Sequence, residues 1–236
     1  MTTTEPSIPW TQESAESLRT TSRIAGYAAL AAATSMIIGA VLSVSSGADL
    51  DRALAANTTA EYLETATANQ SLLVGNLTAW ILGVLLFGVA GAAFFRMCRR
   101  RRTLAQIGLL CYWTAVPLAI ASFVAMLAVV VQVAPQGTAE AVLIAEVMGW
   151  FGSRADWIAT VLVVGIGPLL ISVAGRDEWV PGWLAYWAMA AALAGILTVA
   201  AMFRDALSTY GFLVVPIGLG WTIAAGVVAL GHARSI

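Results

Sequence analysis

The chain of 236 residues has no lysine, and only 11% of its residues are charged. Without lysine, no imine can form with retinal or another carbonyl cofactor. The two cysteines are too few for a scaffold built on disulfides. A soluble domain of this length needs more charge to cover its surface, whereas 60% of this chain is apolar. The composition is therefore that of an all-α, polytopic integral membrane protein.

Sequence motifs for familiar active-site chemistry are also missing. There is no P-loop, no dinucleotide-binding glycine motif, no H-E-x-x-H zinc motif and no G-x-S-x-G nucleophile elbow. His232 is the only histidine, and the spacing of Cys98 and Cys111 suits no metal site. We therefore expect no cofactor and no metal. The one basic run, Arg99 to Arg102, is better explained by a bilayer than by nucleic acid.

Six apolar segments have about the length needed to cross a bilayer. They lie at about residues 24–44, 72–95, 106–131, 157–174, 183–203 and 210–230. Residues 1–22 are polar without apolar periodicity, and we expect a disordered cytoplasmic tail there. The predicted six-helix transmembrane domain covers residues 23–231, and residues 232–236 form a second cytoplasmic tail.

The distribution of arginine predicts the orientation of the bundle. The side that holds the two termini carries nine arginines: Arg19, Arg23, Arg96, Arg99, Arg100, Arg101, Arg102, Arg176 and Arg234. The other side carries three: Arg52, Arg154 and Arg204. Basic loops stay in the cytoplasm, so both termini are predicted to be cytoplasmic. Arginine without lysine, together with abundant alanine, fits a GC-rich bacterial genome and hence a bacterial cytoplasmic (inner) membrane.

Two segments on the outer side have helical character of their own. Ser46 to Asp49 and Thr58 to Glu61 fit the S/T-x-x-D/E pattern of a helix start. Residues 47–71 are therefore expected to form a short helix and then a helical lead-in to the second span. Residues 140–151 are too short to cross a bilayer. They are expected either to lie in the interface as a separate amphipathic helix or to extend the fourth span.

Small residues recur at helical spacing and predict close contacts between helices. The stripes are Ser35–Gly39–Ser43, Gly75–Ala79–Gly83 and Ala188–Ala192–Gly195. Pro117, Pro168 and Pro216 lie inside predicted spans, where the missing amide produces a kink. The most deformable stretches are expected at residues 165–168 and 216–220.

Between their flanks, the predicted spans contain no Asp, Glu, Lys, Arg or His. Proton relays and ion-coupled carriers normally keep an ionisable group at depth, so coupled transport through a midplane carboxylate is disfavoured. Asn76 and Thr78 are the main polar side chains of the second span. One hydrogen bond between helices would account for them.

Ionisable side chains converge instead at the outer rim. Arg154 and Asp156 stand at the predicted start of the fourth span, and Arg204 and Asp205 at the end of the fifth. These four residues are the candidate catalytic set, because paired carboxylates and guanidinium groups can perform acid–base work on a lipid-like substrate. The alternative is structural. Asp156 lies three residues after Ser153, which is the spacing of a capping box, and Arg204 suits the C-terminus of a helix.

Three stretches resemble a large group of uncharacterised bacterial six-helix membrane proteins that is defined only as a domain of unknown function. They are Arg23 to Gly26, Pro181 to Trp187 and Gly211 to Trp221. The resemblance covers residues 23–230 and implies the six-span topology. It implies no catalytic residue.

The leading functional hypothesis is a non-catalytic accessory or interaction subunit. The alternatives are a membrane-embedded enzyme that acts on a lipid or isoprenoid at the outer interface, and a carrier for a neutral or apolar compound. The expected partners are the lipid bilayer, a membrane protein or a second copy of the chain, and anionic lipid at the basic run of Arg99, Arg100, Arg101 and Arg102. Nucleic acid is not among them.

Overall fold

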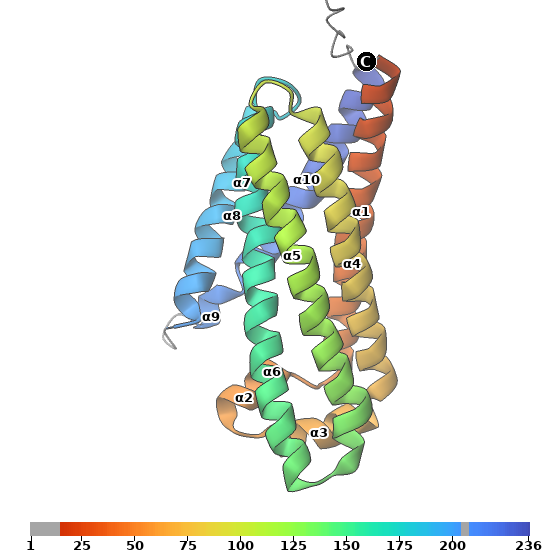
Figure 1. Ribbon diagram of the computed structural model, residues 1–236, viewed down its shortest axis with the longest axis vertical. Coiled ribbons are helices and arrows are strands. Elements are labelled where there is room, and N and C mark those ends of the chain that lie inside the picture. The colour runs from red at the N-terminus through yellow and green to blue at the C-terminus, as the bar shows by residue number, and fades with distance from the viewer. Residues whose placement is uncertain (1–14, 204–207) are drawn as a thin grey trace, which may run out of the picture.

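The protein is a bundle of six long helices, seen in a computed structural model that describes residues 15–203 and 208–236 (Figure 1). Six helical runs are long and apolar enough to cross a membrane: Ala15–Ser46, Gln70–Met97, Arg102–Gln136, Ala139–Gly175, Gly182–Ala201 and Val214–Ser235. No strand occurs in these residues. The prediction of an all-α bundle of six membrane-spanning helices is confirmed.

The helices follow one another in a simple order. They are α1 (Ala15–Ser46), α2 (Leu50–Ala56), α3 (Thr59–Ala68), α4 (Gln70–Met97), α5 (Arg102–Ala128), α6 (Ala139–Thr160), α7 (Gly167–Gly175), α8 (Gly182–Ala201), α9 (Ser208–Gly211) and α10 (Val214–Ser235). In Figure 1, the start of α1 and the end of α10 lie at one end of the bundle, which we call the terminal end. The opposite end, the α2–α3 end, holds α2, α3 and the turn between α5 and α6.

The α2–α3 end matches the prediction of a short helix followed by a lead-in to the second long helix. The N-cap of α2 is Asp49, whose side chain accepts a hydrogen bond from the Arg52 amide at 3.0 Å. Asn57 ends α2 in the left-handed conformation, with φ of 55°. Then α3 begins directly after Thr58. Ser46 is not a cap, because α1 continues through it.

The helices α1 and α4 pack along much of their length and are joined by side chains that hydrogen-bond to backbone across the seam. Ser35 Oγ donates to the Ala79 carbonyl at 2.7 Å, and Asn76 Nδ2 donates to the Gly39 carbonyl at 2.9 Å. A Cβ at Gly39 would overlap the Trp80 ring. The small residues, whose spacing predicted contacts between helices, therefore let the backbones approach closely enough for polar side chains to reach across.

The fourth long helix is the main difference from the sequence prediction. It begins at Ala139, not near residue 157, and continues to Gly175. Gly137 turns the chain with φ of +62°, and Thr138 caps the helix by accepting a hydrogen bond from the Ala141 amide at 3.2 Å. These turn and cap residues directly precede Ala139, so the helix starts there. Residues 140–151 extend this helix and are not a separate interfacial piece.

The three prolines predicted to kink helices lie in three different surroundings. Pro168 has no N–H to donate, and the residues just before it, Val161–Ile166, form a π-helical turn between α6 and α7. Pro117 lies inside α5, which stays helical around it. Pro216 is not in a helix interior, because α10 begins only at Val214. A first-turn amide has no helical partner, so a proline there costs no hydrogen bond.

Candidate functional site

A cleft of about 500 Å³ opens where α2 and α9 lie against α6 and the end of α8. We call it the α2 cleft. Its size falls within the range of small-molecule sites. The residues that line it are Asp49, Asp51, Arg52, Leu54, Ala55, Trp150, Ser153, Arg154, Trp157, Thr198, Ala201, Met202, Gly211 and Phe212.

The two arginines of the α2 cleft have no carboxylate partner among the described residues. The Arg154 guanidinium lies 5.9 Å from the centroid of the Trp150 ring, a cation–π distance. Arg52 is exposed at the rim. Both cations are therefore available to an anionic group that enters the cleft.

The two carboxylates of the cleft are already engaged by hydrogen bonds. Asp49 caps α2, and Asp51 Oδ2 accepts a hydrogen bond from Trp157 Nε1 at 3.3 Å. The Trp157 ring in turn meets the edge of Phe212, with centroids 4.8 Å apart. An aromatic wall thus connects α6 to the residues that follow α9, and Asp51 holds its indole end.

Tyr62 of α3 is buried, and the charges of the same two carboxylates act on it. Burial raises the pKa of its phenol to about 12, and the negative charges of Asp49 and Asp51 raise it further in the same direction. The phenol therefore stays neutral at physiological pH. The negative charges of Asp49 and Asp51 in the cleft therefore help to keep this phenol protonated.

Asp156 faces away from the α2 cleft. It lines a separate cavity of about 50 Å³ inside the bundle, which we call the Asp156 cavity. The other residues around this cavity are Met36, Val84, Phe87, Ala115, Ala119, Ala159, Thr160, Val163, Val164, Val215 and Leu219. The interpretation of Asp156 as a helix cap is wrong, because the helix begins seventeen residues earlier, at Ala139. The expectation that every span lacks an ionisable group is wrong for the same reason.

The structure separates two members of the predicted catalytic set. Arg154 lines the α2 cleft and Asp156 lines the Asp156 cavity. Arg204 and Asp205 lie outside the described residues. The catalytic role of the set stays a prediction. Glu140 and Glu146, which lie near the start of α6, line neither cavity.

Sequence reasoning missed that α2 supplies one wall of the cleft. Asp49, Asp51 and Arg52 lie about a hundred residues before Arg154, and the chain folds them against α6. A close approach makes this possible: a Cβ at Gly149 would lie 3.0 Å from Leu50 Cδ2. The signal available in the sequence was the cluster of charges at residues 49–52 within an otherwise apolar chain.

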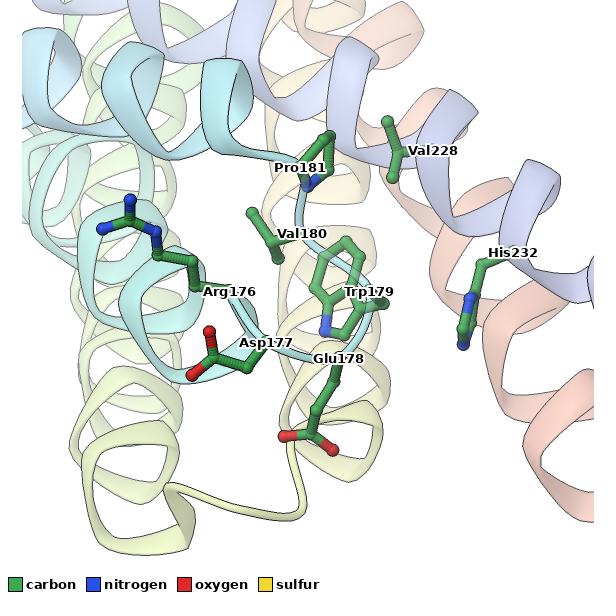
Figure 2. Close-up of a pocket in the computed structure, with 8 residues that line it drawn as sticks. All are labelled: Arg176, Asp177, Glu178, Trp179, Val180, Pro181, Val228 and His232. Carbon is green, nitrogen blue, oxygen red and sulfur yellow. The ribbon is translucent and has the colours of Figure 1, made fainter.

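The terminal end holds a second, open pocket of about 520 Å³ (Figure 2). Residues 176–181 form one wall, and Val228 and His232 of α10 form the other. The Glu178 carboxylate points away from this pocket toward the turn between α4 and α5. There it accepts hydrogen bonds from the Arg99 amide at 2.8 and 2.9 Å and from the Arg100 amide at 3.0 Å.

Other members of the basic run also contact the protein itself. Arg101 forms an ion pair with Asp177 at 3.0 Å, and the Arg102 guanidinium lies 4.1 Å from the centroid of the Phe95 ring. The run therefore joins two loops of the terminal end, a role that the sequence did not indicate.

Cys98 is buried under this junction. Trp179 stacks on Phe94 with centroids 5.2 Å apart, and its Nε1 donates a hydrogen bond to Cys98 Sγ at 3.5 Å. Burial raises the pKa of the Cys98 thiol to about 11, although the hydrogen bond from Trp179 opposes this shift. No group of three His, Cys, Asp or Glu side chains that could hold a metal ion occurs within residues 15–203 and 208–236.

Comparisons with protein-family models, with curated proteins and with solved structures gave no match to this chain. The predicted resemblance to the uncharacterised six-helix group stays a prediction.

Proposed function

We propose that this multi-pass membrane protein is a non-catalytic binding subunit that holds a zwitterionic amphiphile in the α2 cleft. The observation that carries the proposal is the lining of a cleft of about 500 Å³ by unpaired arginines beside an aromatic wall. A guanidinium group matches a phosphate in charge and geometry. Arg154 and Arg52 would contact the phosphate, and Asp49 and Asp51 have free lone pairs for a neighbouring ammonium group.

The apolar part of such a molecule also has a place in this cleft. Leu54, Met202 and the rings of Trp157 and Phe212 form its apolar surface. Tryptophan is typical of the membrane–water interface, where a lipid head group meets its chains. The charged head group of an amphiphile would therefore contact the charged residues of the cleft, and its apolar chain would contact the apolar wall.

The enzyme hypothesis has weaker support. It needs Asp156, Arg154, Arg204 and Asp205 around one reacting bond, and general acid–base catalysis requires hydrogen-bond reach to the same substrate. Arg154 and Asp156 border different cavities. Binding without chemistry needs only the groups that share the α2 cleft.

We also propose that the protein resides in a bacterial inner membrane, with the terminal end in the cytoplasm. The nine arginines assigned to that side support this orientation through the positive-inside rule. Anionic lipid at Arg99 to Arg102 belongs to the same proposal, with exposed Arg100 as its main contact. A membrane-protein partner or a second copy of the chain is the proposed partner of the accessory role.

Lipid retention tests the proposed ligand. The full-length protein is reconstituted into nanodiscs of equal phosphatidylethanolamine and phosphatidylglycerol, released into mild detergent, and analysed by native mass spectrometry. We expect one retained phosphatidylethanolamine, strongly reduced in Arg154→Gln. The control is Arg234→Gln, an exposed arginine at the terminal end, which should retain the lipid as the wild type does. Equal retention in both variants, or retention of phosphatidylglycerol alone, would overturn the proposal.

A further inference from the structure

Among the residues that the structure describes, Asp156 is the only ionisable one that lines the Asp156 cavity. Among the other lining residues, only Thr160 carries a polar side chain, and it lies one helical turn after Asp156. The carboxyl of Asp156 has no hydrogen bond or ion pair to any described residue. A lone carboxyl thus borders a small apolar space in the interior of the bundle.

The cavity lies within the apolar thickness of the protein. Val84 is thirteen residues from the end of α4 at Met97, and Ala115 is thirteen residues from the start of α5 at Arg102. At 1.5 Å per residue, both lie about 20 Å from the terminal end of their helices. Since the hydrocarbon core of a bilayer is about 30 Å thick, the cavity falls inside it.

Among the described residues, no other charged side chain lines the Asp156 cavity, although the negative charge of Asp51 on α2 acts on Asp156 from outside it. The lining is Met36 from α1, Val84 and Phe87 from α4, Ala115 and Ala119 from α5, and Val215 and Leu219 from α10. Arg154 lies two residues before Asp156 in the chain, and Asp51 accepts a hydrogen bond from Trp157, the residue after Asp156. Both Arg154 and Asp51 line the α2 cleft. An ionised carboxylate without a partner is unfavourable in such surroundings, whereas the neutral acid fits them. Ionisable residues that persist inside a membrane commonly mark a proton or ion pathway.

We propose that Asp156 is a proton-binding site inside the membrane domain. In one state the side chain is a carboxylic acid. In the other, its O–H bond has broken, the electron pair stays on the carboxylate, and the proton is on a water molecule that has entered the cavity. The space of about 50 Å³ is large enough to admit water, since a cavity needs about 10–15 Å³ to hold one water molecule.

The π-helical turn gives this site a means to admit water. Val163 and Val164 of that turn line the cavity, and the turn runs directly into Gly167 and Pro168. Because Pro168 donates no hydrogen bond, one carbonyl of the preceding turn lacks its helical partner. A π turn can therefore rearrange its hydrogen bonds more easily than a regular α-helix, and π turns are frequent at functional sites.

A proton suits this site better than a metal cation does. Calcium takes about six to eight oxygen ligands, and magnesium requires about six in octahedral geometry. The side chains around the cavity offer only the Asp156 carboxylate and the Thr160 hydroxyl. The inference does not rest on the amphiphile proposed for the α2 cleft.

Labelling with dicyclohexylcarbodiimide tests the proposal, because this apolar reagent adds to protonated carboxyl groups in apolar surroundings. The full-length protein in detergent is labelled across a pH series and mapped by peptide mass spectrometry. We expect an adduct on Asp156 that decreases as pH rises. It should be absent in Asp156→Asn and retained in Glu146→Gln, a matched control because Glu146 lies on the same helix and lines neither cavity. A lack of adduct on Asp156 at every pH in a folded protein would contradict the proposal.

Infrared spectroscopy provides a second readout that needs no reagent to enter the cavity. The carbonyl stretch of a protonated carboxylic acid should be present in the wild type at neutral pH and missing from Asp156→Asn. Protection of Asp156 from the carbodiimide by sodium or magnesium at constant pH would instead identify a metal-cation site and overturn the assignment. Equal infrared spectra for the two proteins would also overturn it.

Discussion

Both carboxylate oxygens of Glu178 lie within hydrogen-bonding distance of the Arg99 amide, at 2.8 and 2.9 Å. The Arg100 amide donates to the same carboxylate at 3.0 Å. These contacts connect the turn after α4 with the turn after α7, two segments nearly eighty residues apart in sequence. The basic run therefore presents backbone amides, as well as side chains, to an acidic loop.

Glu178→Ala is expected to lower the free energy of unfolding by about 1–2 kcal/mol. Hydrogen bonds to a charged group contribute about 1.5–3 kcal/mol, and partial exposure places this site at the lower end. The comparison variant is Asp177→Asn, which removes the ion pair with Arg101. Its side chains are 47% and 49% exposed, so the expected loss is below about 1 kcal/mol. Thermal melting in detergent measures both, and a larger loss for Asp177→Asn would refute the ranking.

Gly218→Ala is expected to destabilise the bundle by about 1–3 kcal/mol, as overpacking does in a tight core. An added Cβ would overlap the Val164 carbonyl oxygen and lie 2.5 Å from Val164 Cβ. Gly231 of the same helix is the matched control, because a Cβ there meets nothing within 4 Å. Gly231→Ala should keep or slightly raise the melting temperature, since alanine favours a helix by up to about 1 kcal/mol. Equal melting temperatures for the two variants would count against this α10 contact.

Tyr62 predicts a loss of stability at alkaline pH. Its pKa in the folded protein is about 12, against 10.0 for an ordinary tyrosine. The unfolded chain ionises first as pH rises above about 10, so stability that is complete below that pH is lost as pH approaches about 12. The maximum loss is about 2–3 kcal/mol, at 1.36 kcal/mol per pKa unit. Tyr62→Phe should remove this part of the alkaline loss in melting experiments. Identical pH profiles for the two proteins would argue against a buried neutral phenol.

Cysteine labelling tests the orientation. Single cysteines at Ser14, Ser235 and Thr59 are introduced into a chain that lacks Cys98 and Cys111. A thiol reagent that cannot cross membranes should label only the Thr59 position in intact cells, because the basic loops keep the terminal end inside. Permeabilised cells provide the control, in which all three positions should react. Labelling of the Ser14 and Ser235 positions in intact cells would reverse the assignment.

The sequence predicted the six helices and the stripes of small residues at helix contacts because both depend on local patterns, but it did not predict that α1 packs against α4. Apolar length identifies a membrane helix, and the spacing of Ser35 and Gly39 places them on one helix face. Arg154 and Asp156 were interpreted as the start of a span because charges usually flank such segments. Within one continuous helix, two residues apart means a rotation of about 200°, so the two side chains face different cavities. The role of α2 in the cleft depends on a contact across a hundred residues, which no local pattern contains.

The unequal lengths of neighbouring helices have a consequence for the surrounding lipid. At 1.5 Å per residue, the 20 residues of α8 cover about 30 Å, whereas the 37 residues from Ala139 to Gly175 cover about 55 Å. If the hydrocarbon core of the bilayer matches α8 in thickness, the start of α6 extends beyond the hydrocarbon. The surface of the protein is therefore stepped at this end, because the start of α6 projects beyond the end of α8. The α2 cleft is lined by residues on both sides of that step, so we expect a molecule that moves sideways within the leaflet to reach it without first entering water.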